Sequence, residues 1–192
     1  MNWIDVISAI LGLTTVVLAG RNSKYNFWVG YAYNIFLFCL FWKQNLWAAM
    51  ALQPVAFAIN LYGHWRWTHP SAEETSARDG KSLKVSSVGV QEWIFSILLA
   101  IGGACGIIAM LMQTNDPAPV LDGSILALTF LAQWLSAQKK WECWIVWLLV
   151  NAGNLTLYIV GGLKFMPVVS ALYIINGLWS LYSWRKTFNK GE

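Results

Sequence analysis

Seven runs of apolar residues alternate with polar connections along the chain. A helix needs about 20 residues, at a rise of about 1.5 Å per residue, to cross a hydrocarbon core about 30 Å thick. Runs of about this length cover residues 3–20, 25–42, 46–67, 93–113, 120–137, 141–160 and 163–184. The pattern therefore predicts an all-α membrane protein with seven transmembrane helices.

The first three runs match the last three at a constant spacing of 117 residues, without a gap. Matching pairs are Asp5 and Asp122, Leu11 and Leu128, Leu18 and Leu135, Asn34 and Asn151, Leu40 and Leu157, Leu46 and Leu163, and Trp67 and Trp184. We expect a 3+1+3 arrangement, with repeats at 1–67 and 114–192 and a linker helix at 92–113. One intervening helix makes the two repeats cross the membrane in the same direction, around an axis along the membrane normal.

Composition agrees with a membrane protein. Hydrophobic residues make up 57% of the chain and charged residues 11%, whereas soluble domains carry about a quarter charged residues. Many of the 13 tryptophans lie near the ends of the runs, where amphipathic rings favour the membrane interface. We expect a multi-pass protein of a bacterial plasma (inner) membrane, whose net charge of +4 reflects topology and anionic lipid rather than nucleic-acid binding.

Lys and Arg residues lie mostly on one side of the expected topology. The side reached after the first, third, fifth and seventh runs holds Arg21, Lys24, Arg66, Arg78, Lys81, Lys84, Lys139, Lys140, Arg185, Lys186 and Lys190. Only Lys43 and Lys164 lie on the other side. Because cytoplasmic loops are enriched in Lys and Arg, we expect an external N-terminus and a cytoplasmic C-terminus.

One connection is long, and it covers residues 68–91. It is rich in Ser, Thr, Glu, Lys and Arg, which is typical of a flexible linker. We expect a cytoplasmic loop that supplies slack and charge and has no regulatory motif. In the run that follows, Gly102 and Gly106 form a small-residue face, expected to seat that helix on the bundle or on a neighbouring protomer of a homo-oligomer.

Polar side chains inside the runs form stripes with helical spacing. Two stripes contain Gln53, Phe57, Asn60, His64 and Trp67, and Trp144, Trp147, Asn151, Asn154 and Tyr158. Further polar groups come from Tyr31 and Asn34, and from Ser170, Tyr173 and Asn176. Such residues either join helices through hydrogen bonds of roughly 0.6 to 2 kcal/mol or face a substrate path.

The stripes suit a flat, neutral or monocationic ligand. Paired aromatic rings accept a heteroaromatic ring between them, and amides and hydroxyls bind a sugar or carboxamide. No Asp, Glu, Lys or Arg lies deep in a run, which disfavours a phosphorylated substrate. Asp5, Asp122 and Glu142 lie near expected helix N-termini, where a carboxylate stabilises the helix dipole.

Three segments resemble the PnuC family of vitamin transporters, whose fold is similar to that of SWEET sugar transporters. They are KWECWIVWLLVN at 140–151, LWAAMALQ at 46–53 and LYGHWRW at 61–67. The most specific part is Lys140, Glu142, Trp144 and Trp147. The resemblance implies a substrate site formed by Gln53, Asn60, Trp144, Trp147, Asn151, Tyr173 and Asn176, to which the stripes add Tyr31 and Asn34.

The resemblance also implies uptake of nicotinamide riboside by facilitated diffusion, followed by trapping through a cytoplasmic kinase. Relatives in that family take up thiamin, riboflavin or deoxynucleosides, and these substrates remain alternatives. No cofactor is implied.

Other classes of protein fit less well. A membrane receptor or sensor would be expected to carry a soluble output domain. A sugar or lipid flippase is a further alternative, because pyranose rings also stack on tryptophan. An enzyme would need a nucleophile and base or a metal cluster in the runs. Histidine is limited to His64 and His69, and Cys39, Cys105 and Cys143 match no metal motif, so we expect no enzyme.

Overall fold

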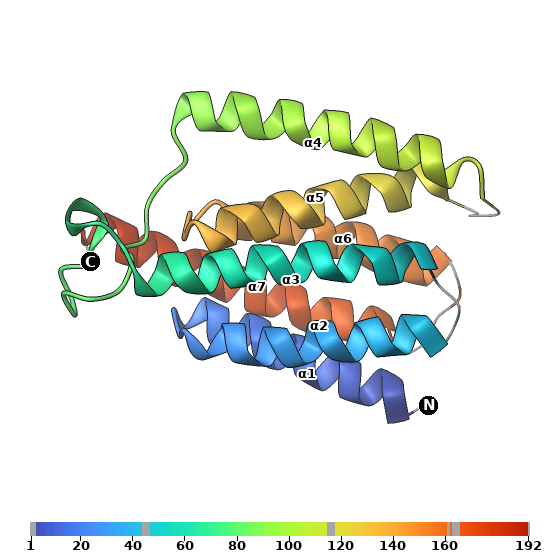
Figure 1. Cartoon of the computed structure of the whole chain (residues 1–192), viewed down its shortest axis with the longest axis horizontal. Helices are drawn as coiled ribbons and strands as arrows, with labels where there is room; N and C mark the ends of the chain where they lie inside the picture. The colour runs from blue at the N-terminus through green and yellow to red at the C-terminus, as the bar shows by residue number, and fades with distance from the viewer. Residues whose placement is uncertain (1–2, 44–46, 115–117, 161, 163–165, 192) are drawn as a thin grey trace.

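The computed structural model describes residues 3–43, 47–114, 118–160, 162 and 166–191. Over these residues it is all-helical, as the apolar pattern predicted. The helices are α1 (Trp3–Gly20), α2 (Tyr25–Lys43), α3 (Trp47–Thr68), α4 (Val90–Leu111), α5 (Pro119–Ala137), α6 (Cys143–Val160) and α7 (Met166–Asn189), with a short 3₁₀ helix η1 (Ala72–Glu74). The N- and C-termini lie at opposite ends of the bundle (Figure 1).

Helix bounds follow the apolar runs to within about one turn for the first six helices. The expected start of the last run, residue 163, lies outside the described residues. α7 extends past Trp184 to Asn189. Its last turns carry Arg185 and Lys186, so the helix continues into polar surroundings where apolar length no longer predicts its end.

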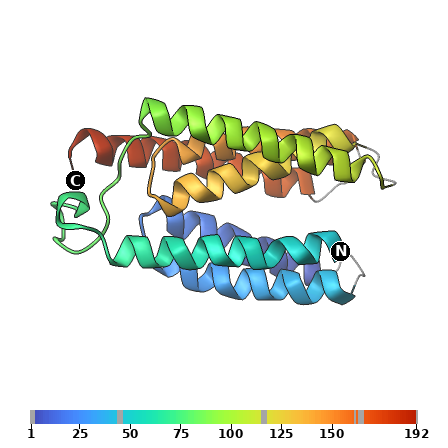
Figure 2. The ribbon, with the colours of Figure 1, turned by 45° about the horizontal axis from the view of Figure 1, so that its top comes forward.

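The helices form two triplets, α1–α3 (the first triplet) and α5–α7 (the second triplet), which face each other (Figure 2). Within each triplet neighbouring helices pack in sequence, and between the triplets α1 packs on α7 and α3 on α5. Under the 117-residue spacing α1 corresponds to α5 and α3 to α7, so the two inter-triplet contacts are equivalent to each other. Among the described residues α4 packs on α5 alone, at the outside of the bundle (Figure 1).

Three of the described helices, α4, α5 and α6, are long and apolar enough to cross a membrane by length and composition. α1 contributes a shorter apolar helix at Val6–Gly20. The outer helix α4 is the most apolar, with a mean hydropathy of 2.5, and only 6% of its apolar stretch is buried. Space is open around both Gly102 and Gly106, so the small-residue face does not seat α4 on the bundle.

Two tryptophans join the triplets through equivalent hydrogen bonds. Trp67 at the end of α3 donates from Nε1 to the carbonyl oxygen of Ser136 in α5, at 3.2 Å. Trp184 in α7 donates from Nε1 to the carbonyl oxygen of Ala19 in α1, also at 3.2 Å. Because Ser136 and Ala19 are themselves related by the 117-residue spacing, the repeat in sequence is also a repeat of contacts.

The same two tryptophans belong to a buried aromatic layer, formed by Phe27, Trp67, Trp144 and Trp184. The rings of Trp67 and Trp184 lie 5.7 Å apart across the boundary between the triplets. Phe27 meets Trp67 edge-on at 5.1 Å, and its equivalent Trp144 meets Trp184 edge-on at 5.6 Å. All four side chains are at most 4% exposed, so this layer closes one end of the bundle.

Residues 69–89, here named the strap, cross that end between the triplets, and we call it the strap end (Figure 1). Leu83 donates its backbone N–H to the carbonyl oxygen of Trp67 at 3.2 Å, and Ser86 donates to that of Lys139 at 3.1 Å. Trp141 donates back to the carbonyl oxygen of Ser86 at 3.1 Å. The strap therefore ties the end of α3 to the turn between α5 and α6.

The interpretation of this segment as a flexible linker is wrong. Leu83, Val85 and Val88 are at most 8% exposed and join the core cluster that contains the aromatic layer. Polar composition concealed these three apolar anchors, whose burial, together with the backbone hydrogen bonds, offsets the entropy of ordering the chain.

Candidate functional site

Four asparagines, here named the asparagine layer, lie at a common level about two helical turns from the aromatic layer. The layer consists of Asn34, Asn60, Asn151 and Asn176, from α2, α3, α6 and α7. Two turns correspond to about 11 Å along a helix axis. The asparagine layer thus draws one amide from each of four helices, two in each triplet.

The amide of Asn34 differs from those of Asn151 and Asn176 in lacking a partner for its nitrogen among the described residues. Asn34 is 8% exposed, and its Nδ2 atom has no hydrogen-bond partner in the described structure. A buried polar group without a partner costs about 1 to 3 kcal/mol. A ligand carbonyl or hydroxyl at this position would remove that cost.

Two other amides already donate hydrogen bonds. Asn151 donates from Nδ2 to the carbonyl oxygen of Trp147 at 2.8 Å, within α6. Asn176 donates from Nδ2 to the carbonyl oxygen of Val16 at 3.3 Å, which links α7 to α1 across the triplet boundary. Both residues are half-buried and retain a side-chain oxygen that can accept a hydrogen bond.

Asn60 lies against α2 at a glycine. A Cβ atom added to Gly30 would come within 2.6 Å of Nδ2 of Asn60, so only glycine lets this amide approach so closely. Gln53, two turns further along the same face of α3, is half-buried.

Three tyrosines lie close together beside the asparagine layer. Tyr33 of α2 and Tyr158 of α6 both interact electrostatically with Tyr173 of α7. The hydroxyl of Tyr173 points at Gly12 of α1, where an added Cβ atom would clash with it. Asp122, in the first turn of α5, also interacts with Tyr158. This tyrosine cluster draws on both triplets.

Sequence reasoning selected Tyr173 alone from this cluster. Tyr158 continues the stripe of Asn151 and Asn154 and could have been chosen on spacing. Tyr33 lies on a different face of α2 from Tyr31, and the approach to Gly12 depends on tertiary packing. No local pattern in the sequence reveals either feature.

Two of the expected site residues contact protein groups in this conformation. The hydroxyl of Tyr31 lies 2.9 Å from Nδ1 of His64, within the first triplet. Trp144 is 2% exposed in the aromatic layer. Trp147, one turn from Asn151, is half-buried and packs against the edge of the core. Tyr31 and Trp147 each lie about one helical turn from the asparagine layer, whereas Trp144 lies two turns away.

Charged groups concentrate at the strap end rather than around the asparagines. Arg66 donates two hydrogen bonds to the carboxylate of Glu74, at 3.0 and 2.8 Å. This pair and a hydrogen bond from Ser71 lower the pKa of Glu74 to about 2. Lys139 donates from Nζ to the carbonyl oxygen of Leu83 at 2.6 Å, and its burial lowers its pKa to about 8.

Glu142 also holds the strap. It is 5% exposed, and its Oε1 accepts hydrogen bonds from the hydroxyl of Ser87 and from the backbone N–H of Val88, the latter at 3.0 Å. We expected a carboxylate that stabilises a helix dipole. The structure uses it to anchor the strap, because its side chain faces residues far away in sequence.

The described residues contain no group of three or more His, Cys, Asp or Glu that could hold a metal ion. The amides, hydroxyls and rings described above offer hydrogen bonding and ring stacking. Two packed helix triplets with amides and hydroxyls between them form the architecture of a membrane transporter.

Comparison with known proteins identifies the family. The chain belongs to the family described as "Nicotinamide mononucleotide transporter", which matches residues 2–186. It is 25% identical to the nicotinamide riboside transporter PnuC of Neisseria mucosa, covering 96% of this chain and 73% of that protein. It is 29% identical to the riboflavin/roseoflavin transporter RibM of Streptomyces davaonensis, covering 95% and 84%. The PnuC of Escherichia coli is 24% identical, covering 92% and 84%.

A solved structure agrees with this assignment. The crystal structure of the vitamin B3 transporter PnuC superposes with a TM-score of 0.77 at 19% identity, over 99% of this chain and 83% of that one. This likeness concerns the fold. The resemblance to PnuC seen in the sequence is thereby confirmed, and the protein is a transporter rather than an enzyme.

Proposed function

We propose that this protein imports nicotinamide riboside across a bacterial inner membrane by facilitated diffusion. The observation that carries the proposal is the family match over residues 2–186, together with relatives named as nicotinamide riboside transporters. The interior of the bundle adds support, because amides, hydroxyls and rings suit a neutral sugar joined to a cationic heteroaromatic ring.

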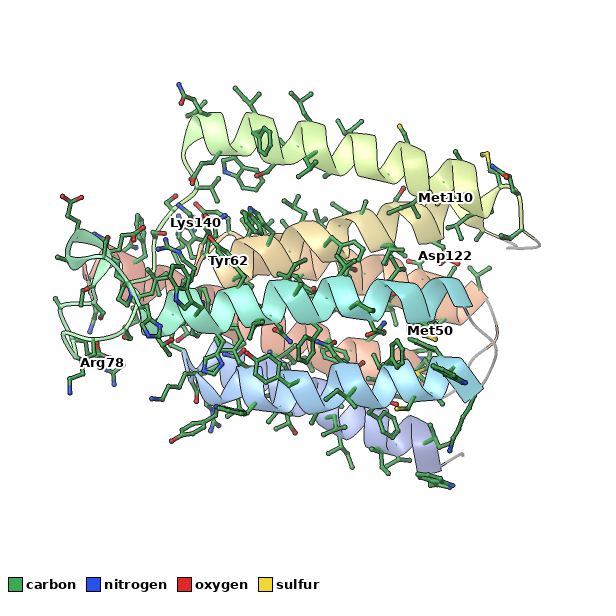
Figure 3. All side chains as sticks on the ribbon, in the orientation of Figure 1. Met50, Tyr62, Arg78, Met110, Asp122 and Lys140 are labelled. Carbon is green, nitrogen blue, oxygen red and sulfur yellow. The ribbon has the colours of Figure 1, made fainter. Side chains whose placement is uncertain are left out.

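In this proposal all seven helices span the membrane in a 3+1+3 arrangement, with α4 as the linker helix. The equivalent bonds of Trp67 and Trp184 support two parallel repeats. Most Lys and Arg residues belong to the strap end, where Arg78 and Lys140 lie (Figure 3), so that end is cytoplasmic and the N-terminus is external. An enzyme active only outside the cytoplasm should work when inserted at residues 113–119 and fail in the strap, and the opposite result would reverse the orientation.

The substrate would bind at the asparagine layer. Asn34 supplies a buried amide N–H group without a protein partner. The Oδ1 atoms of Asn151 and Asn176 would accept hydrogen bonds from the ribose, and Trp147 would stack on the nicotinamide ring. Gln53, Asn60, Tyr33 and Tyr173 complete the site, and the hydroxyl of Tyr158 extends it toward the outside.

Transport would follow from rocking of one triplet against the other, which requires the strap end to open. No acid or base lies deep in the apolar runs to carry a coupled proton or ion. Accumulation inside the cell would then come from a cytoplasmic kinase, which lowers the free concentration of the vitamin by phosphorylating it.

Purified protein in sealed liposomes tests both substrate and energetics. Labelled nicotinamide riboside should reach equal concentrations on the two sides, with or without a proton or sodium gradient. Accumulation driven by either gradient would reject facilitated diffusion. Liposomes without protein provide the control.

A second candidate substrate is riboflavin, which is favoured by the 29% identity to RibM. Competition in the same liposomes separates the two. Excess unlabelled nicotinamide riboside should abolish uptake of its labelled form, whereas riboflavin and thiamin should not. Saturable riboflavin uptake without uptake of nicotinamide riboside would favour the alternative.

A further inference from the structure

A cavity of about 350 Å³ lies at the strap end, apart from the asparagine layer. Its walls come from three connections and from the end of α7. They include Arg21 and Asn22 of the α1–α2 turn, Arg78 and Asp79 of the strap, and Lys139 of the α5–α6 turn. Asn22 and Lys139 are equivalent under the 117-residue spacing, and both have left-handed backbone conformations with φ of 57°. The two matching turns thus face the cavity from the two triplets.

Positive charge dominates this cavity. Arg21, Arg78 and Lys139 contribute three cations, against the one carboxylate of Asp79. Oδ1 of Asp79 already accepts hydrogen bonds from the backbone N–H groups of Lys81 and Ser82, at 3.0 and 2.9 Å. Within the described residues neither guanidinium pairs with a carboxylate. Their hydrogen-bond donors remain available.

Two buried polar groups also border the cavity. Lys139 is 4% exposed and donates one ammonium hydrogen to the carbonyl oxygen of Leu83. The side-chain oxygen of Asn22 is buried and has no hydrogen-bond partner in the described structure. Such a site offers strong donors to an anion and one acceptor to a hydroxyl. The forked guanidinium groups match the oxygens of a phosphate.

We propose that this cavity binds the phosphate group of a phosphate monoester, with Arg21, Arg78 and Lys139 as its ligands. The volume exceeds that of one phosphate group and leaves room for a hydroxyl-bearing ester at Asn22. The location of such a ligand in the cytoplasm rests on the proposed function, whereas the binding itself does not.

Occupation of the cavity would oppose opening of the strap end. The bound phosphate would bridge one turn from each triplet and the strap between them, so it stabilises the closed arrangement through its higher affinity for that state. A phosphorylated product accumulating inside the cell would in this way slow further import. Transport would be matched to consumption of the product.

Thermal unfolding of the full chain in lipid-free detergent micelles tests the binding, with inorganic phosphate as the probe. At constant ionic strength, phosphate should raise the midpoint of unfolding saturably, relative to chloride. Arg78→Gln and Arg21→Gln should each weaken the apparent affinity at least about tenfold. Lys81→Gln removes the same charge from an exposed strap residue outside the cavity lining and should leave the affinity unchanged. No phosphate effect, or an equal loss in Lys81→Gln, would overturn the proposal.

A measurement with lipid vesicles distinguishes a soluble phosphate ester from a lipid headgroup as the source of the phosphate group. Phosphatidylcholine vesicles with and without phosphatidic acid replace the micelles, and inorganic phosphate is omitted. Stabilisation by inorganic phosphate but not by phosphatidic acid supports a soluble ester. Stabilisation by phosphatidic acid alone would overturn the soluble ligand in favour of a lipid headgroup.

Uptake measurements then test, separately from the proposed function, whether bound phosphate opposes opening of the strap end. Inorganic phosphate enclosed in liposomes should slow entry of nicotinamide riboside through the wild type at least about twofold more than through Arg78→Gln. Equal slowing of both proteins would show that phosphate bound in this cavity does not oppose opening of the strap end. Absence of any uptake would count against the proposed substrate and leave the unfolding result standing.

Discussion

At the strap end, the first and second triplets hold equivalent residues in equivalent contacts. Trp67 and Trp184 donate to matching carbonyl groups, and Phe27 and Trp144 meet them edge-on. Further along the helices the equivalence is only partial: Asn34 still corresponds to Asn151, but other positions differ. Tyr173 corresponds to Ala56 in the first triplet, so a tyrosine side chain in one repeat is replaced by a methyl group in the other. The repeat thus preserves the contacts that join the triplets and varies the side chains between them.

The difference between matched and unmatched positions distinguishes residues that pack the triplets together from residues that bind a ligand. A contact that recurs in both triplets is explained by the stability of their junction. A polar or aromatic group that is present in one triplet only, and is not hydrogen-bonded to another side chain, has no such explanation and suits an asymmetric ligand. Trp147, whose counterpart in the first triplet is Gly30, is an example. Variants that remove shared contacts should therefore affect stability, whereas those in unmatched positions should affect binding.

Loss of a shared tryptophan should have the largest effect. Trp184→Ala and Trp67→Ala should each lower the stability by about 3 to 5 kcal/mol, because each empties a fully packed site at the junction. The double variant should lose less than the sum, since the two rings touch. Chemical unfolding in detergent measures this, with Trp3→Ala, 66% exposed, as the control. Additive losses would show that the rings act independently.

Crowding at Gly12 should have the next largest effect on stability. Gly12→Ala places a methyl group against the hydroxyl of Tyr173, and such overpacking costs about 1 to 3 kcal/mol. Adding Tyr173→Phe should restore stability by removing that oxygen, yet leave transport impaired. Gly102→Ala, where space is open, provides the matched control for both unfolding and uptake. Full activity in Gly12→Ala would remove the tyrosine cluster from the substrate path.

The unmatched ring of Trp147 should matter for affinity. Trp147→Ala should weaken binding of nicotinamide riboside by about 1 to 3 kcal/mol, or about 5- to 150-fold, as for aromatic stacking on nucleobases. Calorimetry on monodisperse protein measures the change, and Trp147→Phe should recover much of it. Trp141→Ala reproduces the loss of a half-buried indole at the strap end and should leave affinity nearly unchanged. Equal affinities for all variants would exclude Trp147 from the site.

Replacement of the Tyr31–His64 contact by its counterpart should have the smallest effect. The second triplet has Leu148 and Leu181 at the equivalent positions. His64→Leu alone should lower stability by about 0.5 to 1.5 kcal/mol, the net contribution of a hydrogen bond. The double change to leucine should recover part of this loss and keep transport, as unfolding and uptake assays would report. Loss of uptake in the double variant would instead assign the pair a role in transport.

Apolar length was sufficient to predict seven helices, because a membrane-spanning run constrains both composition and length. The 117-residue spacing also identified Trp67 and Trp184 as equivalent positions of the two repeats, although not their contact with each other. The strap could not be predicted, since Leu83, Val85 and Val88 are too few to outweigh its polar composition. Its order depends on hydrogen bonds with residues of the α5–α6 turn.

The candidate site was predictable in part. Helical spacing selected the asparagines, because polar residues in an apolar run must face a partner or a ligand. The same rule placed Tyr31 in the site, although its hydroxyl meets His64. Spacing gives the face of a helix and leaves open which neighbour that face meets. Only packing shows that Asn34 has a buried amide nitrogen without a partner.

The tip of the strap offers a natural place to divide the polypeptide. Space is open around Gly80, which has a φ of +62°, while Ser76 donates its N–H to the carbonyl oxygen of Ser82 across the tip at 2.7 Å. A break before Gly80 would leave Glu74 bound to Arg66 on one fragment, and the buried leucine and valines of the strap on the other. The two triplets could therefore be made as separate subunits that assemble into one transporter, and each could then be labelled or exchanged independently of the other.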